Sequence, residues 1–300
     1  MSKKKKKRIS GGGSAASAVV NEPQPAVKAR RSLFLGLLVL GVLAAISAPL
    51  VFQEDTAQAA GITQTPTRYR FKVVRKIPHD PQAYTQGLLV HEGHFYESTG
   101  LNGQSSVRRL DPDSGSVLLK RDLDARYFGE GLHFYRGVLM QLTWRAGELL
   151  IYDSASLEPL RSYRYQGEGW GLTGSGDHLF RSDGTSRLHV HDARDFSLLR
   201  SVTVRQGGRE VGGLNELEWI DGRIWANVYG TNRVVIIDPD KGDVTGTVDF
   251  SGLLERQDRH GREDVLNGVA YDSTTGRIFV TGKRYGFIYE VELEPLSSEG

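Results

Sequence analysis

The sequence predicts an all-β fold: a five-bladed β-propeller whose last blade is closed by the N-terminal strand, preceded by one transmembrane or signal-anchor helix. Two observations support the propeller. A short opening motif recurs five times, at steps of 44, 40, 45 and 52 residues. Each copy is followed by alternating runs rich in Val, Ile, Leu, Tyr and Phe, a pattern typical of antiparallel strands. The membrane segment is predicted from an uncharged run over residues 32–52.

The first part of the chain differs in composition from the rest. Residues 1–31 hold nine Lys or Arg and one acid, and they predict a disordered cytoplasmic tail. Residues 32–52 are long enough to span a bilayer, and the basic residues before them place the N-terminus in the cytoplasm. We therefore expect a membrane-anchored protein whose main domain is periplasmic or extracellular. Cleavage after Ala59, in "AQA", would instead release it as a secreted protein.

Charge and cysteine content exclude some classes of function. Beyond residue 31 the chain has 29 basic residues (38 less nine) and 35 acidic ones (36 less one), a net charge of −6. A mildly acidic domain argues against nucleic-acid binding, which needs a basic surface. The chain has no cysteine, so neither a disulfide nor a thiolate nucleophile is available. We expect a monomer.

The repeat defines the expected elements in chain order. After a linker over residues 53–68, four apolar runs per copy predict a four-stranded blade, and the five copies fill residues 69–294, before a tail over 295–300. The fifth copy has only three runs, while "RYRFKVVRKI" precedes the first copy unassigned. We expect this strand to complete the last blade, which closes the ring and covers an open edge. A β-sandwich or two small barrels would not explain five copies in register.

The repeat register also predicts a site. The first strands of all blades begin at one rim of the central channel, and the second strands end there. The opening positions are Gln86, Glu130, Trp170, Asn215 and Asn267, and the second-strand ends are Gly100, Trp144, Gly184, Tyr229 and Lys283. Equivalent positions thus differ in chemistry, as a single asymmetric pocket requires. A glutamate among indoles should be desolvated, with its pKa raised towards the range useful for proton transfer.

The same segments carry a family resemblance. In order and at compatible spacing, "YTQGLL", "FGEGL", "QLTW", "GEGWGLT", "LNELEW", "DVLNGVAYD" and "FVTGK" resemble the plant and bacterial glutaminyl-peptide cyclotransferases over about residues 70–293. The resemblance implies a five-bladed propeller enzyme that converts the N-terminal glutamine of peptides and proteins to pyroglutamate. Ammonia is released, and neither a metal nor another cofactor is expected.

Roles for individual residues follow from this resemblance. Glu130 would be the general acid and base, Gln86 and Asn215 would hold the substrate amide and amine, and Lys283 would stabilise the oxyanion or anchor a peptide carbonyl. Phe128 would pack beneath the glutamate. The predicted catalytic residues are Glu130, Asn215 and Lys283, and the predicted substrate-binding residues are Gln86, Phe128, Trp144, Trp170, Tyr229 and Asn267.

Two positions depart from the family pattern. Tyr84 stands where the family more often has phenylalanine, and Tyr229 stands where a third tryptophan is usual. The second change leaves substrate affinity open. The role of the insertion over residues 253–265, a lid or a long loop, is open as well. We expect Glu168 at the rim of the pocket and not inside it.

Two other functions remain as alternatives. One is a propeller that binds peptides without turnover, which has less need of a desolvated acid. The other is a metal-dependent lactonase-type propeller, which needs several carboxylate or amide ligands, whereas the predicted ring supplies one carboxylate. His189 and His191 share one strand face, but no third ligand is placed beside them, so we interpret them as a strand face and not a metal site.

Overall fold

The computed structural model describes residues 65–297. The predicted cytoplasmic tail and the predicted membrane segment over residues 32–52 lie outside this range. Within it, the fold is all-β, and its one helical element is the short 3-10 turn η1 (Arg256–Asp258). No helix of the described part is long and apolar enough to cross a membrane.

Three antiparallel sheets of four strands each follow one another along the chain. Each is a meander in which neighbouring strands pair in sequence order, as the four apolar runs per copy predict. The first sheet contains β2 (Thr85–His91), β3 (His94–Thr99), β4 (Ser106–Leu110) and β5 (Val117–Asp122). The second sheet contains β6 (Gly129–Tyr135), β7 (Val138–Thr143), β8 (Glu148–Asp153) and β9 (Pro159–Arg164). The third sheet contains β10 (Leu172–Ser175), β11 (His178–Ser182), β12 (Arg187–Asp192) and β13 (Leu198–Thr203).

The remaining strands form one eight-stranded sheet and a two-stranded ribbon, β14 (Arg205–Gln206) with β15 (Arg209–Glu210). The strand order of the large sheet is β16-β17-β18-β19-β1-β22-β21-β20. Its members are β1 (Thr67–Pro78), β16 (Leu214–Ile220), β17 (Arg223–Val228), β18 (Arg233–Ile237), β19 (Val244–Asp249), β20 (Leu266–Asp272), β21 (Arg277–Gly282) and β22 (Phe287–Pro295).

The N-terminal strand pairs with the last strand, as the sequence predicts. β1 runs antiparallel to β22 from Tyr69, opposite Pro295, to Pro78, opposite Phe287. The sequence did not predict a second pairing, in which the first residues of β1 run parallel to β19. Gly246 permits this close approach, because a Cβ there would lie 3.1 Å from the ring of Tyr69. The last two sequence repeats therefore share one continuous sheet.

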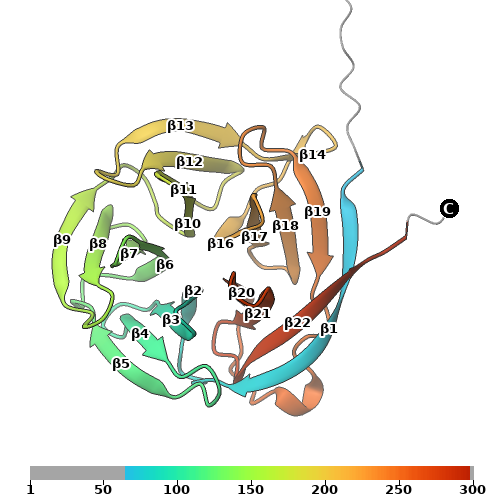
Figure 1. Cartoon of the computed structure of the whole chain (residues 1–300), viewed down its shortest axis with the longest axis horizontal. Coiled ribbons are helices and arrows are strands. Elements are labelled where there is room, and N and C mark those ends of the chain that lie inside the picture. Colours follow the sequence, from blue (N-terminus) through green and yellow to red (C-terminus); the bar gives the residue numbers. More distant parts are fainter. Residues whose placement is uncertain (1–64, 298–300) are drawn as a thin grey trace, which may run out of the picture. The chain divides into compact units, whose positions relative to one another are not determined.

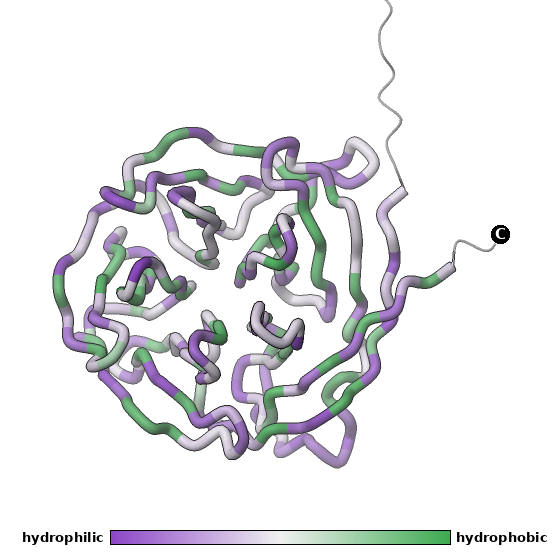
Figure 2. The backbone as a smooth tube through the Cα atoms, viewed as in Figure 1, coloured by the Kyte–Doolittle hydropathy of each residue, from purple (hydrophilic) through white to green (hydrophobic). Residues whose placement is uncertain are grey.

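The sheets are arranged in a propeller-like ring (Figure 1). The first strands β2, β6, β10, β16 and β20 lie nearest the centre, and β5, β9, β13, β1 and β19 lie at the periphery. Hydrophobic and hydrophilic residues alternate along the strands (Figure 2). Apolar side chains of neighbouring sheets pack together; Leu142 and Ile151, for example, share one fully buried cluster with Leu172. This burial is the main stabilising contribution to the ring.

Around the centre, the first strands approach one another very closely. A Cβ on Gly87 would lie 2.6 Å from the backbone nitrogen of Leu132, and one on Gly171 would lie 2.0 Å from the backbone oxygen of Asn215. Register shifts occur at the same level in β2, β6, β16 and β20. Such bulges redirect individual side chains. Here they fall at four of the five opening residues of the repeat, Gln86, Glu130, Asn215 and Asn267.

Candidate active site

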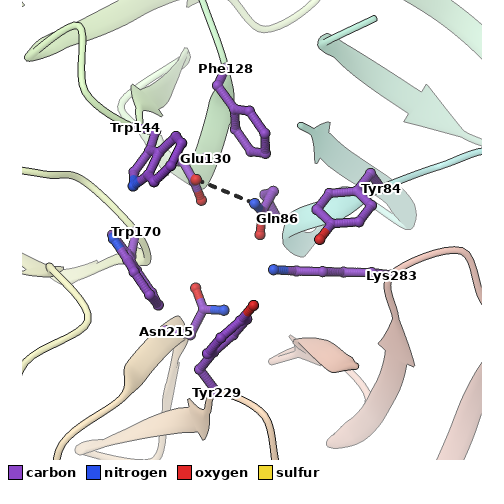
Figure 3. Close-up of a pocket in the computed structure, with 9 residues that line it drawn as sticks. All are labelled: Tyr84, Gln86, Phe128, Glu130, Trp144, Trp170, Asn215, Tyr229 and Lys283. Atoms are coloured by element: carbon purple, nitrogen blue, oxygen red, sulfur yellow. Dashed lines mark hydrogen bonds between the residues drawn. The ribbon is translucent and has the colours of Figure 1, made fainter. Parts of the chain in front are cut away.

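A cavity of about 200 Å³ lies where the predicted site residues converge (Figure 3). Eight of the nine predicted residues line it, together with Tyr84, and they come from all three small sheets and from the large one. The lining residues are Tyr84, Gln86, Phe128, Glu130, Trp144, Trp170, Asn215, Tyr229 and Lys283.

Glu130 is the buried acid of this cavity. It lies in the bulge of β6 and is 4% exposed, and its Oε1 accepts one hydrogen bond, from Nε2 of Gln86 at 3.2 Å. Burial raises the pKa of Glu130 well above its ordinary value of 4.5; the positive charge of Lys283 opposes this shift, and the negative charge of Glu168 adds to it. A raised pKa suits a carboxyl group that must both take and return a proton.

Lys283 follows β21 and brings a cation to the opposite side of the cavity. Its Nζ lies 5.0 Å from the ring centre of Tyr84 and 5.1 Å from that of Tyr229. Burial lowers the pKa of Lys283, whereas the charges of Glu130 and Asp264 raise it. The two aromatic faces stabilise the ammonium where water is largely excluded.

The carboxamides divide into two that line the cavity and one behind it. Gln86 and Asn215 point into the cavity, and the buried Oδ1 of Asn215 has no hydrogen-bond partner among residues 65–297. Asn267, predicted to bind substrate, does not line the cavity. Its Nδ2 instead donates to the backbone oxygen of Thr85 at 3.0 Å and to Oε1 of Gln86 at 3.3 Å. The repeat register placed Asn267 at the right level, but its amide faces β2 and orients Gln86.

Aromatic rings form the side walls. Phe128 packs against Trp144 with ring centres 5.6 Å apart, and Trp170 meets Tyr229 edge to face at 5.5 Å. Gly184 makes room for one wall, because a Cβ there would lie 2.7 Å from the ring of Trp170. Tyr229 is 47% exposed and so stands at the mouth of the cavity. The walls leave a narrow apolar slot between Glu130 and Lys283.

Two acids support the lining from outside. Oε2 of Glu168 accepts hydrogen bonds from Nε1 of Trp144 at 2.7 Å and of Trp170 at 2.9 Å, so this residue lies behind the walls, at the rim. Oδ2 of Asp264, at the end of the insertion, accepts a hydrogen bond from the hydroxyl of Tyr84 at 2.8 Å. No sequence signal pointed to Asp264, since the insertion has no repeat register. Glu168, by contrast, precedes the aligned position by only two residues.

The remaining polar candidates are used within the fold. Nε2 of His189 lies 2.8 Å from Oδ2 of Asp183, and Nδ1 of His191 lies 2.9 Å from the backbone oxygen of Phe196. Within residues 65–297, no group of three or more His, Cys, Asp or Glu side chains is placed to hold a metal ion.

Known proteins resemble this chain over most of the described region. Residues 42–293 match the family model described as glutamine cyclotransferase. The glutaminyl-peptide cyclotransferase of Arabidopsis thaliana is 40% identical over 233 residues, which cover 76% of this chain and 72% of that protein. The crystal structure of Myxococcus xanthus glutaminyl cyclase superposes with a TM-score of 0.73 at 38% identity, covering 77% of this chain and 100% of that one.

Proposed function

The chain belongs to the glutamine cyclotransferase family, and we propose that it carries out the family reaction with Glu130 as the proton carrier. It acts on peptides with an N-terminal glutamine and converts that residue to pyroglutamate. The residue roles that follow rest on the geometry of the cavity.

Binding is the first task of the site. The glutamine side chain must curl so that its amide carbon meets its own α-nitrogen, and the slot between Trp144, Trp170 and Tyr229 favours such a compact shape. Gln86 and Asn215 supply the polar contacts; the free Oδ1 of Asn215 is placed to accept a hydrogen bond from a substrate N–H. The attack is intramolecular, and holding the two ends in contact removes most of the conformational entropy cost that remains.

Proton transfer is the second task. The α-nitrogen attacks the side-chain amide carbon, and the carboxylate of Glu130 accepts the proton that this nitrogen loses. As the bond from that carbon to the amide nitrogen breaks, Glu130 returns the proton to the leaving nitrogen, and ammonia departs. One bond forms, one breaks, and Glu130 ends in its initial state. Such a positioned group contributes about 10²–10⁴ in rate, or ~3–5 kcal/mol of the barrier.

Charge stabilisation is the third task. Negative charge develops on the amide oxygen during the attack, and the ammonium of Lys283 is the cation that faces the slot. A fixed charge at a water-poor site stabilises such an oxyanion strongly. The same ammonium favours the ionised form of Glu130, because it opposes the effect of burial on the pKa of that carboxyl.

One observation carries this mechanism: the buried Glu130 has a single hydrogen bond and faces the cavity, so its free oxygen is available to the substrate. The test is ammonia release from Gln-initiated dipeptides by the full chain in mild detergent, with and without chelator. Glu130→Gln should lower kcat by about 10²–10⁴-fold, whereas Glu148→Gln, outside the cavity, should not. A folded wild-type chain that binds these peptides without turnover would instead support a peptide-binding propeller, and loss of activity with chelator would support a metal-dependent enzyme.

The architecture and location of the enzyme also belong to this proposal. We count the eight-stranded sheet as two blades, β16–β19 and β20–β22 with β1, which gives five blades over residues 69–294. Residues 32–52 would anchor this domain as a signal-anchor, with the catalytic domain outside the cytoplasm and a monomer as the working unit. Protease protection in intact cells tests the orientation, and light scattering of the detergent-purified chain tests the monomer.

A further inference from the structure

We propose that Glu168 is a positioning residue, which fixes both tryptophan walls of the cavity through a single carboxylate oxygen. Oε2 of Glu168 accepts the N–H of Trp144 at 2.7 Å and the N–H of Trp170 at 2.9 Å. This inference rests on the proposed function and adds to it a residue outside the lining.

The orientation of the indoles agrees with a shared acceptor. Figure 3 shows both indole nitrogens on the side of the rings away from Lys283, so that carbon faces border the slot. Trp144 follows β7 and Trp170 precedes β10, so the two walls belong to neighbouring sheets. One acceptor for both N–H groups therefore sets the spacing of the walls across the gap between sheets. Hydrogen bonds to a charged acceptor are about twice as strong as neutral ones.

Glu168 is itself held from two directions. Its other oxygen, Oε1, accepts a hydrogen bond from Nε of Arg145 at 2.9 Å, and the guanidinium carbon of Arg145 lies 3.8 Å from the ring centre of Trp144. Its backbone oxygen accepts a hydrogen bond from the buried guanidinium of Arg181. The two carboxylate oxygens thus have separate partners, the indoles on one and Arg145 on the other. We call Glu168 and the two indoles that it holds the clamp. Because its two oxygens have separate partners, the clamp can be tested by isosteric substitution.

The charge of Glu168 reaches the proton carrier as well. It raises the pKa of Glu130, in opposition to Lys283, and the hydroxyl of Tyr165 is the other titratable group near that carboxyl. The pKa of Glu168 itself is lowered by the hydrogen bonds from Trp170, Arg145 and Trp144, against the effect of its partial burial. Glu168 therefore stays ionised at neutral pH, where it holds the walls and adds negative potential.

The first experiment compares Glu168→Gln with a matched control, Asp177→Asn, in the full chain. A glutamine has one acceptor, so it must place its NH₂ group against either the two indoles or Arg145. We expect kcat/KM for a Gln-initiated peptide to fall about tenfold to hundredfold. The acid limb of the profile of kcat/KM against pH should move to lower pH, because the pKa of Glu130 falls when a nearby negative charge is lost. Asp177 lies in the turn after β10 and accepts hydrogen bonds from Tyr135 and Arg136. The kcat/KM and pH profile of Asp177→Asn should match those of wild type.

A second variant separates hydrogen bonding from charge. In Glu168→Gln with Arg145→Met, no donor competes with the indoles for the amide oxygen, so both walls regain their acceptor. We expect kcat/KM to recover most of the loss, while the acid limb stays at the lower pH because the charge is still absent. The chain has four tryptophans, so its ¹⁵N indole spectrum contains few signals. Two of them should shift in Glu168→Gln, return towards wild type in the double variant and stay unchanged in Asp177→Asn.

The outcomes distinguish this inference from the proposed function. If wild type turns over its substrate but Glu168→Gln keeps both its kcat/KM and its pH profile, the positioning role is wrong. It is also wrong if the double variant recovers nothing, since the loss would then be general damage to the fold. An inactive wild type would overturn the proposed function instead, and the indole signals would still confirm or refute the clamp.

Discussion

Replacing Glu216 by glutamine should stabilise the fold at neutral and alkaline pH. Glu216 lies in the bulge of β16 and is almost fully buried, and no cation of the described part of the chain shifts its pKa. Its two oxygens accept the backbone N–H groups of Val269 at 2.9 Å and Leu88 at 3.4 Å. Burial raises its pKa from 4.5 to about 8, and these two hydrogen bonds oppose the shift only in part. The folded chain thus holds a proton that the unfolded chain releases.

The magnitude follows from linkage. Between pH 4.5 and 8 the folded state binds more protons than the unfolded state, so stability falls as pH rises through this window. The difference between 8 and 4.5, at ~1.4 kcal/mol per pH unit, gives an upper limit of ~5 kcal/mol. Because protein interiors relax around a buried charge, we expect about 2–3 kcal/mol. Glutamine resembles the protonated acid in shape and keeps an acceptor for Val269, so the variant should escape this loss.

Urea unfolding of the full chain, followed by tryptophan fluorescence, measures the effect. The gain in unfolding free energy of Glu216→Gln over wild type should be small at pH 5 and should increase steadily up to pH 8. Asp177→Asn, at a partly exposed carboxylate, is the matched control for the loss of an acid. The reasoning fails if the two curves run parallel between pH 5 and 8, since Glu216 would then ionise alike in the folded and unfolded chains.

Three further substitutions test the fold and the site. Glu97→Gln removes the anion of a fully buried cluster with a histidine and an arginine and should cost about 3–5 kcal/mol in urea unfolding; a loss below about 1 kcal/mol would contradict this. Gly171→Ala places a Cβ 2.0 Å from a backbone oxygen and should cost about 3 kcal/mol, whereas Gly212→Ala, with no atom within 4 Å, should cost little. Lys283→Met removes the cation that lowers the pKa of Glu130, so the acid limb of the pH profile of kcat/KM should move to higher pH. An unchanged acid limb would show that the charge of Lys283 does not act on Glu130.

The repeat register made most of the site predictable from sequence. First-strand openings and second-strand ends meet at one rim whatever the side chains are, so alignment alone brings Glu130, Trp170 and Lys283 together. The orientation of a side chain is not part of that register. Asn267 lies at the predicted level, yet its amide faces Thr85 and Gln86 and not the cavity.

Features outside the repeat could not be predicted. The parallel contact between β1 and β19 involves three residue pairs and uses backbone groups, which any sequence supplies. The insertion has no apolar period, and its hydrogen bond from Tyr84 to Asp264 joins residues that are 180 positions apart. Both features depend on the path of the chain in three dimensions, which local residue patterns do not encode.

Departures from the repeat have different consequences at two depths of the channel. At the opening level the copies differ in chemistry, as the proposed pocket for a substrate with distinct ends requires. One residue further on, four copies have glycine, at Gly87, Gly131, Gly171 and Gly268, and the first three of these would place a Cβ within 2.6 Å of a neighbouring strand. The fourth copy has Glu216, which accepts the backbone N–H groups of Leu88 on β2 and Val269 on β20. Its contact with β2 lies two residues from Gln86, so the acid that we expect to weaken the fold as pH rises also contacts the strand that presents a cavity residue.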